Sequence, residues 1–235
     1  MHAMTRAGLV LSLCLGLAAC PRPVKPPAPV PSVPAPSVPS GEVPGATNYR
    51  IDSQASVLHI LVYRGGTFAK LGHNHVMSSK SLTGRVWMHP QITQSGFEMT
   101  FPVAELIVDD PDARRAAGSE FPPEIPEADK QGTRKNMLRT EVLDAETYPR
   151  VEVKSVKIEG ALPDAQVTAR ITIKQGTRDV VVPVKVTVSG DRLTAAGEFS
   201  IQQTDFGMKP FSVAMGALEV KDRLDVRFNV VALKR

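Results

Sequence analysis

Thiols and familiar catalytic signatures are scarce in this 235-residue chain. Its two cysteines, Cys14 and Cys20, lie near the N-terminus, so the remainder offers no thiol for disulfides, thiolate catalysis or cysteine-bound metals. The sequences G-x-S-x-G, S-x-x-K and H-E-x-x-H do not occur. A hydrolase needs a nucleophile beside a base and an orienting acid. We therefore predict no catalytic residues and no enzyme activity.

Charges of the two signs are close to balanced. The chain carries 28 Lys and Arg residues against 24 Asp and Glu, a net charge of +4, and loss of residues 1–19 would remove Arg6 alone and leave +3 (4 − 1). Nucleic-acid surfaces are usually more basic, and their positive residues cluster. We therefore expect no nucleic-acid partner.

Residues 1–19 have the features of a secretory signal peptide. Arg6 precedes an apolar run, Ala7–Ala19, which is shorter than the roughly 20 residues needed to cross a bilayer. The tetrad Leu17-Ala18-Ala19-Cys20 resembles the lipobox of bacterial lipoproteins. That resemblance implies that Cys20 is lipidated and becomes the mature N-terminus. The alternative is an ordinary signal peptide that is cut elsewhere.

Residues 20–47 are expected to form the lipidated cysteine and a proline-rich linker. Residues 21–46 contain ten of the twenty prolines and no pattern that could bury a face. Such a segment favours a polyproline-II spacer, which at about 3.1 Å per residue would extend up to roughly 80 Å. A proline-rich recognition motif is the alternative. The folded domain is then expected to occupy residues 48–235.

Alternation of apolar and polar residues dominates this domain and is typical of half-buried strands. Leu224, Val226 and Phe228, for example, share one face while Arg223, Asp225 and Arg227 occupy the other. Strands are predicted at 56–63, 82–88, 96–102, 150–158, 166–174, 180–188, 192–202 and 218–233. Pro183 interrupts one of them, and because it lacks an N–H it indicates an edge, a bulge or a strand start.

Residues 109–148 are the exception to this pattern. Pro126, Glu127 and Asp129 are typical of a helix start, so one or two short helices are expected here. Asp109, Asp110 and Asp112 lack the spacing of a calcium loop, and we interpret them as a solvated turn. About eight antiparallel strands in an all-β domain suit a closed barrel or a sandwich, and an eight-stranded barrel has room for one small ligand.

Four stretches, taken in order, resemble the YceI-like family of bacterial periplasmic proteins. They are N-Y-R-I-D-S-Q-A-S-V-L-H-I (48–60), R-K-N-M-L-R-T-E-V-L-D-A-E-T-Y-P-R-V-E-V-K-S (134–155), I-T-I-K-Q-G-T-R-D-V-V-V-P-V-K-V (171–186) and F-S-I-Q-Q-T-D-F-G-M (199–208) with D-R-L-D-V-R-F-N-V-V-A (222–232). The resemblance implies an eight-stranded, lipocalin-like antiparallel barrel whose apolar interior takes an isoprenoid or other lipid chain, without catalytic residues.

The apolar side chains of the predicted strands either line such a cavity or fill a solid core, and the resemblance favours a cavity. Met is adaptable enough to accommodate a flexible chain. The expected ligand-lining residues are Phe97, Phe101, Phe199, Phe206, Phe211, Phe228, Met88, Met99 and Met208, and Met215 belongs to the same group. A bound isoprenoid or other lipid is the only cofactor-like molecule that we expect.

The stretch K-L-G-H-N-H-V-M (70–77) departs from the family pattern and places His73 and His75 two residues apart. These imidazoles could bond a ligand head group at the cavity mouth or support a loop. They could also bind a metal or a haem iron, with His59 as a third donor. No Asp or Glu lies close in sequence to orient them, which argues against a metal site.

The first hypothesis is therefore a periplasm-facing lipoprotein of the bacterial cell envelope that binds or carries an apolar lipid and attaches to the membrane through Cys20. Pro21 stands where an aspartate would retain enterobacterial lipoproteins in the inner membrane, so the outer membrane is favoured. One alternative is a metal- or haem-associated stress or redox protein that uses His73 and His75. Another is a lipid-anchored module that binds an envelope protein through residues 109–148. A second copy of the chain is a further candidate partner.

Overall fold

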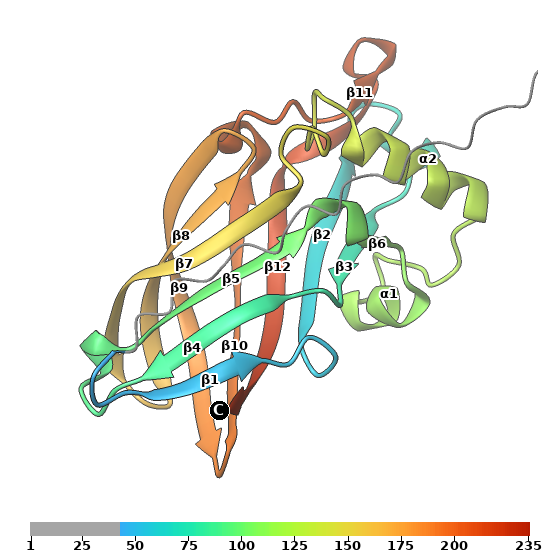
Figure 1. The fold of residues 1–235 in the computed structure, drawn as a ribbon. Coiled ribbons are helices and arrows are strands. Elements are labelled where there is room, and N and C mark those ends of the chain that lie inside the picture. The colour runs from blue at the N-terminus through green and yellow to red at the C-terminus, as the bar shows by residue number, and fades with distance from the viewer. Residues whose placement is uncertain (1–42) are drawn as a thin grey trace, which may run out of the picture. The chain divides into compact units, whose positions relative to one another are not determined.

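A computed structural model describes residues 43–235 (Figure 1). The predicted signal peptide, Cys20 and most of the proline-rich linker lie outside the described residues. Within them, no helix is long and apolar enough to span a membrane.

Eight strand positions close into an antiparallel barrel, as predicted. Each strand is hydrogen-bonded to the next in the order β1 (Thr47–Ile51), β4 (Thr83–Met88), β5 (Gly96–Pro102), β7 (Arg150–Ala161), β8 (Asp164–Ile173), β9 (Gly176–Ser189), β10 (Arg192–Gln202) and β12 (Leu218–Lys234). The ring closes where β1 pairs with β12, with Tyr49 opposite Lys234. Closure removes the exposed edges that an open sheet of this size would present.

Three of the strand positions are bent into two pieces each. β2 (Val57–Gly65) continues β1 along β12, β3 (His75–Ser79) precedes β4, and β6 (Ile107–Val108) follows β5. The second pieces pair in the order β12–β2–β3–β6. The sheet therefore extends beyond the barrel seam on the side that carries the helices (Figure 1).

The segment between β6 and β7 forms two helices, which confirms the predicted insertion. Helix α1 (Pro111–Ala117) begins with Asp110, whose side chain accepts hydrogen bonds from the backbone N–H groups of Asp112 and Ala113 at 3.0 Å. Helix α2 (Glu127–Leu138) starts directly after Pro126 and packs on β6. Arg134 of α2 donates to the carbonyl oxygen of Leu106 at 2.7 Å, which holds the helix against this end of the barrel.

Five short 3-10 turns and one two-residue strand complete the described chain. They are η1 (Ala69–Leu71), η2 (Ile92–Gln94), η3 (Val103–Glu105), η4 (Gln203–Phe206), η5 (Ala214–Gly216) and β11 (Ser212–Val213).

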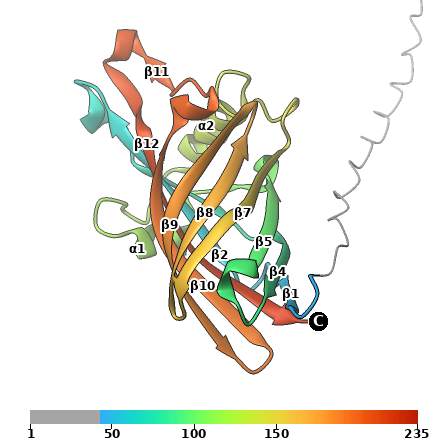
Figure 2. The ribbon, with the colours of Figure 1, turned by 90° about the vertical axis from the view of Figure 1, so that its left-hand side faces the viewer.

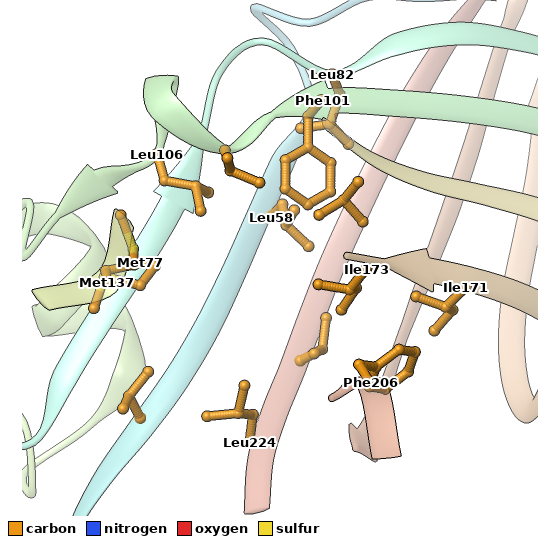
Figure 3. Close-up of a cluster of buried hydrophobic side chains, with 14 of the residues drawn as sticks. Leu58, Met77, Leu82, Phe101, Leu106, Met137, Ile171, Ile173, Phe206 and Leu224 are labelled. Carbon is orange, nitrogen blue, oxygen red and sulfur yellow. The ribbon is translucent and has the colours of Figure 1, made fainter. Parts of the chain in front are cut away.

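Register decides which side chains face the interior. Val226 of β12 lies between Phe199 of β10 and Ile60 of β2, and all three face inward. The next residue, Arg227, lies between Glu198 and His59 on the outside. The period of two thus places an apolar lining inside the barrel. Figure 3 shows such inward side chains from several elements, including Leu58, Met77, Phe101, Ile171, Ile173 and Leu224.

Pro183 lies in the middle of β9, where the strand loses one neighbour. On one side it pairs with Gln166 of β8. On the other side, the last pair of the β9–β10 ladder is Val184 opposite Gly197, so Pro183 has no paired residue on β10. Pro183 has no N–H to donate to the next rung. The predicted edge is therefore local: it affects only the half of β9 that precedes this proline.

Candidate functional site

The barrel encloses a cavity of about 330 Å³. Every strand of the ring contributes to its wall, and so does α2 through Thr133, Asn136 and Met137. Among the described residues that line it, polar side chains are few: His75, Ser95, Thr133, Asn136 and Gln203. A cavity of this volume and character falls within the range of small-molecule sites, about 300–1,000 Å³.

Small residues keep the interior from being filled. Ala165 and Ala169 of β8 and Ala195 of β10 lie in the wall. Each occupies an inward position that a Val, Leu or Phe would fill. The barrel therefore holds a hollow rather than a solid core.

The structure places eight of the nine residues expected to line the cavity in its wall: Phe97, Phe101, Phe199, Phe211, Phe228, Met88, Met99 and Met208. Phe206 does not reach it. That side chain is fully buried in the core beside Ile171, and on its outer side it borders a small groove between β9 and β10 (Figure 3). Met215 is fully exposed, so its expected place in the lining is wrong.

Most of the wall was not singled out in the sequence, because it is aliphatic. Val167 and Ile171 of β8, Val182 and Val184 of β9, and Ile60 of β2 line the cavity as closely as the phenylalanines do. The period-two pattern contains this information, since every second residue of each strand faces inward.

His75 is the polar group best placed at the α2 end of the cavity. It opens β3, lines the cavity, and leaves 14% of its side chain exposed. Its Nδ1 lies 2.6 Å from Oδ2 of Asp109, and its Nε2 lies 3.5 Å from the hydroxyl of Thr133 on α2. One ring nitrogen is thus held by a carboxylate while the other faces α2.

Asp109 is completely buried behind His75, so its interpretation as part of a solvated turn is wrong. Its Oδ1 accepts from the backbone N–H of Val76 at 2.9 Å and from Arg114, and its own N–H donates to the carbonyl of Val76 at 2.8 Å. Burial alone would raise the pKa of Asp109. The hydrogen bonds from His75, Val76 and Arg114 outweigh burial and hold that pKa below its usual value.

Arg114 of α1 compensates the buried charge and is itself fully buried. Besides its ion pair with Asp109, it donates to the carbonyl oxygens of Asn74, at 2.7 Å, and Pro122. Sequence reasoning missed this pair. The two residues are only five apart, but nothing in their spacing distinguishes a buried ion pair from two solvated charges on a helix surface.

The other two histidines do not join His75 in one site. His73 lies in the loop before β3, exposed and outside the cavity wall, with its Nδ1 3.9 Å from Asp129. His59 alternates with the inward residues Leu58 and Ile60 and faces outward. Burial lowers the pKa of His59, Asp110 opposes that shift, and Arg227 adds to it.

The three-histidine metal site is therefore not assembled. Between residues 43 and 235, no group of three or more His, Cys, Asp or Glu side chains is arranged to hold a metal ion. No Asp or Glu lies close to His75 in sequence, but the fold supplies an orienting carboxylate, Asp109, from 34 residues along the chain.

The fold and the site together define an antiparallel β-barrel protein with an apolar interior cavity and one buried polar network at its α2 end. The model of the YceI-like domain matches residues 49–232. The chain belongs to the YceI-like family. A comparison with curated proteins finds no match.

Two solved structures share the fold. BcnA from Burkholderia cenocepacia is 21% identical and aligns with a TM-score of 0.56 over 77% of this chain and 98% of its own. A polyisoprenoid binding domain from Saccharophagus degradans is 12% identical, with a TM-score of 0.52 over 80% of this chain and 98% of its own. At these identities the likeness shows the fold alone.

Proposed function

We propose that this protein binds one apolar lipid chain, of the isoprenoid, quinone-like or acyl class, inside its barrel. The observation that carries the proposal is the cavity of about 330 Å³ with an almost entirely apolar wall. The Saccharophagus degradans domain of the same fold, a polyisoprenoid binding domain, supports it by analogy.

Hydrophobic transfer is sufficient to hold such a ligand. Each buried CH₂ contributes about 0.8 kcal/mol, so a dozen contribute roughly 10 kcal/mol. Association costs on the order of 4–15 kcal/mol in lost translational and rotational freedom. A chain that fills the cavity can therefore bind without a strong polar contact, and the wall sets a preference for length and shape.

The α2 end of the cavity would receive the polar end of the lipid. Because an ionised carboxylate only accepts hydrogen bonds, Nδ1 of His75 donates to Asp109, and Nε2 is the ring nitrogen that faces Thr133. Thr133 and Asn136 line the same region. This set favours a head group that forms hydrogen bonds, such as a hydroxyl.

The cellular setting is also part of the proposal. We propose that residues 1–19 direct secretion, that Cys20 is acylated, and that the barrel faces the periplasm, with the outer membrane favoured as the site of attachment. More than one acyl chain on Cys20 would give stable attachment. Replacement of Cys20 by serine should then move the protein from the membrane fraction to the soluble fraction, and an unchanged distribution would contradict acylation.

The binding proposal is tested by native mass spectrometry of gently purified protein. The wild type should carry a lipid adduct of one defined mass class. Ala195→Phe, which projects a ring into the cavity, should lose most of it. The matched control is Ala196→Phe on the same strand: its side chain points outward, between Lys185 and Asn229, and should leave the adduct unchanged.

Two results would contradict the proposal. One is a wild-type protein without adduct that also fails to take up added polyprenols, quinones or fatty acids. The other is an adduct that survives Ala195→Phe in a variant whose thermal unfolding matches that of the wild type, because such a lipid would be bound elsewhere.

A further inference from the structure

Two loops at the end of the barrel opposite the C-terminus carry large apolar side chains into solvent. Phe68 and Leu71 lie in the loop after β2, with 54% and 77% of their surface exposed. Val213 and Met215 lie in the β11 hairpin, at 41% and 106%. We call these four residues the apolar tip. Figure 2 shows the two loops projecting together beyond the barrel.

The two loops are held together by their backbones. The N–H of Phe68 donates to the carbonyl of Ala217 at 2.6 Å. A Cβ at Gly66 would lie 2.5 Å from the carbonyl oxygens of Gly216 and Ala217, so only glycine permits this approach. Arg64 donates to the carbonyl of Gly72 at 2.5 Å and closes the first loop. The tip is therefore a built surface rather than two independent loops.

Met215 is exposed, and its backbone conformation is one that favours glycine or asparagine. Ala214, Met215 and Gly216 have φ values of 50°, 55° and 88°, the left-handed region in which Gly and Asn are preferred. A methionine there gains nothing from burial and costs backbone strain. Strain of this kind is often kept where it serves a binding surface.

Positive residues outnumber negative ones in the two segments that form the tip. The segments 64–72 and 209–222 carry four cationic residues, Arg64, Lys70, Lys209 and Lys221, all exposed, against two carboxylates, Glu219 and Asp222. Asp222 accepts hydrogen bonds from the backbone N–H and the hydroxyl of Thr204. Among residues 43–235, no ion pair involves any of the three lysines. Exposed apolar side chains with a basic rim are typical of surfaces that bind anionic lipid bilayers.

The tip is continuous with the cavity. Phe211, just before β11, and Val220, on the opposite arm of the hairpin, line the cavity, while Val213 and Met215 between them point into solvent. The segment that forms the outermost apolar surface thus also forms part of the cavity wall. An apolar chain that left the cavity beside Phe211 would find apolar side chains outside as well.

We propose that the apolar tip inserts into the surface of an anionic lipid bilayer, independently of Cys20. The contact is with the membrane itself, whereas the proposed function concerns a lipid inside the barrel. It would bring the cavity to a source or an acceptor of lipid.

The test uses the full chain with Cys20→Ser, so that no anchor contributes, and vesicles of phosphatidylglycerol and phosphatidylethanolamine. Co-sedimentation should show binding that falls at least about tenfold in the variant Phe68→Ser/Leu71→Ser/Met215→Ser. The matched control, Val156→Ser/Val181→Ser/Val188→Ser, removes three exposed valines elsewhere on the barrel and should bind as the parent does. Binding should weaken on purely phosphatidylcholine vesicles and at high salt.

Insertion is measured separately with an environment-sensitive fluorophore at Met215→Cys or, as a control, at Val181→Cys, in the full chain with Cys14→Ser and Cys20→Ser, so that no other thiol is labelled. Brominated lipids should quench only the first. Equal binding of the tip variant and its control, or no quenching at position 215, would overturn the proposal. Native mass spectrometry of the tip variant separates lipid binding inside the barrel from membrane insertion of the tip. If the variant keeps its lipid adduct and loses vesicle binding, both proposals stand. If it keeps the adduct and binds vesicles as before, only the insertion of the tip is rejected.

Discussion

Asp109 is the residue on which the polar end of the cavity depends. A buried carboxylate is costly unless it is paired and hydrogen-bonded, and this one is bonded by Val76, His75 and Arg114 at once. Because the same carboxylate orients His75 and neutralises Arg114, its loss would leave both side chains and the N–H of Val76 without their partner. It therefore serves both the stability of the fold and the geometry of the site.

Asp109→Asn is expected to lower the free energy of unfolding by about 3–5 kcal/mol, because it leaves the fully buried Arg114 without a counter-charge. Urea unfolding followed by circular dichroism measures the change. Asp112→Asn is the control: that carboxylate is exposed and pairs with Arg115 at the surface, so the change should stay within about 0.5 kcal/mol. Equal effects of the two substitutions would contradict the buried network.

The hydrogen bonds and ion pair of Asp109 should also make the stability of the protein depend on pH in the acid range. The folded-state pKa of Asp109 lies below its ordinary value of 3.8, so its contribution to stability is present above that value and is lost as the pH falls through the lower, folded pKa. We expect the unfolding free energy of the wild type to decline below about pH 4, and that of Asp109→Asn to decline less. Parallel curves down to pH 2 would show that another carboxylate controls acid unfolding.

At the residue scale, the sequence indicates the apolar wall better than the polar network. Alternation along β5, β10 and β12 is enough to place Phe97, Phe199 and Phe228 inside the barrel. It cannot show that Asp109 is buried, since that depends on α1 folding back to bring Arg114 to it. Phe206 was misplaced for a related reason: it lies in η4, beyond the end of β10, where the period of two no longer holds.

At the scale of elements, α2 has a role that its sequence does not reveal. The barrel wall lacks a strand pairing between β6 and β7, and α2 stands next to β6 and supplies Thr133, Asn136 and Met137 to the cavity. The helix is therefore part of the container. Its stability should affect how firmly this end of the cavity is closed.

Gly132→Ala should stabilise the protein by about 0.5–1 kcal/mol. Gly132 lies inside α2 with open space where a Cβ would stand, so the alanine adds helix propensity without a clash. Gly118→Ala is the matched contrast in the same insertion: it also has open space, but its φ of +111° is unfavourable for alanine, so it should destabilise. Thermal unfolding of both variants gives the comparison, and a shift of the same sign in both would contradict the assignment.

The longer strands were predictable, and the short pieces β3 and β6 of the bent strand positions were not. β5 and β10 have the predicted bounds because Gly96–Pro102 and Arg192–Gln202 alternate cleanly between turn residues. β3 was not predicted, since Gly65, Gly66 and Gly72 make the region read as a loop and the strand begins only at His75. Pro183 indicated an edge without showing that β9 pairs with β8 over Gly176–Lys185 and with β10 only over Val184–Ser189.

At the scale of the whole molecule, closure and hollowness come from different features. Closure depends on β1 meeting β12 across almost the entire folded chain, a pairing that no local pattern contains and that the family resemblance implied. Hollowness depends on volume. The wall positions held by Ala165, Ala169 and Ala195 decide whether the larger side chains meet in the middle, and composition cannot show which positions face one another.

The most direct test of the central claim, that the barrel is a container for one apolar chain, is a high-resolution crystal structure of the protein purified with its native lipid. We predict continuous elongated density inside the barrel, in contact with Phe97 and Phe228, with its polar end beside His75. An interior closed by its own side chains, with the lipid absent or bound on the outside, would contradict it.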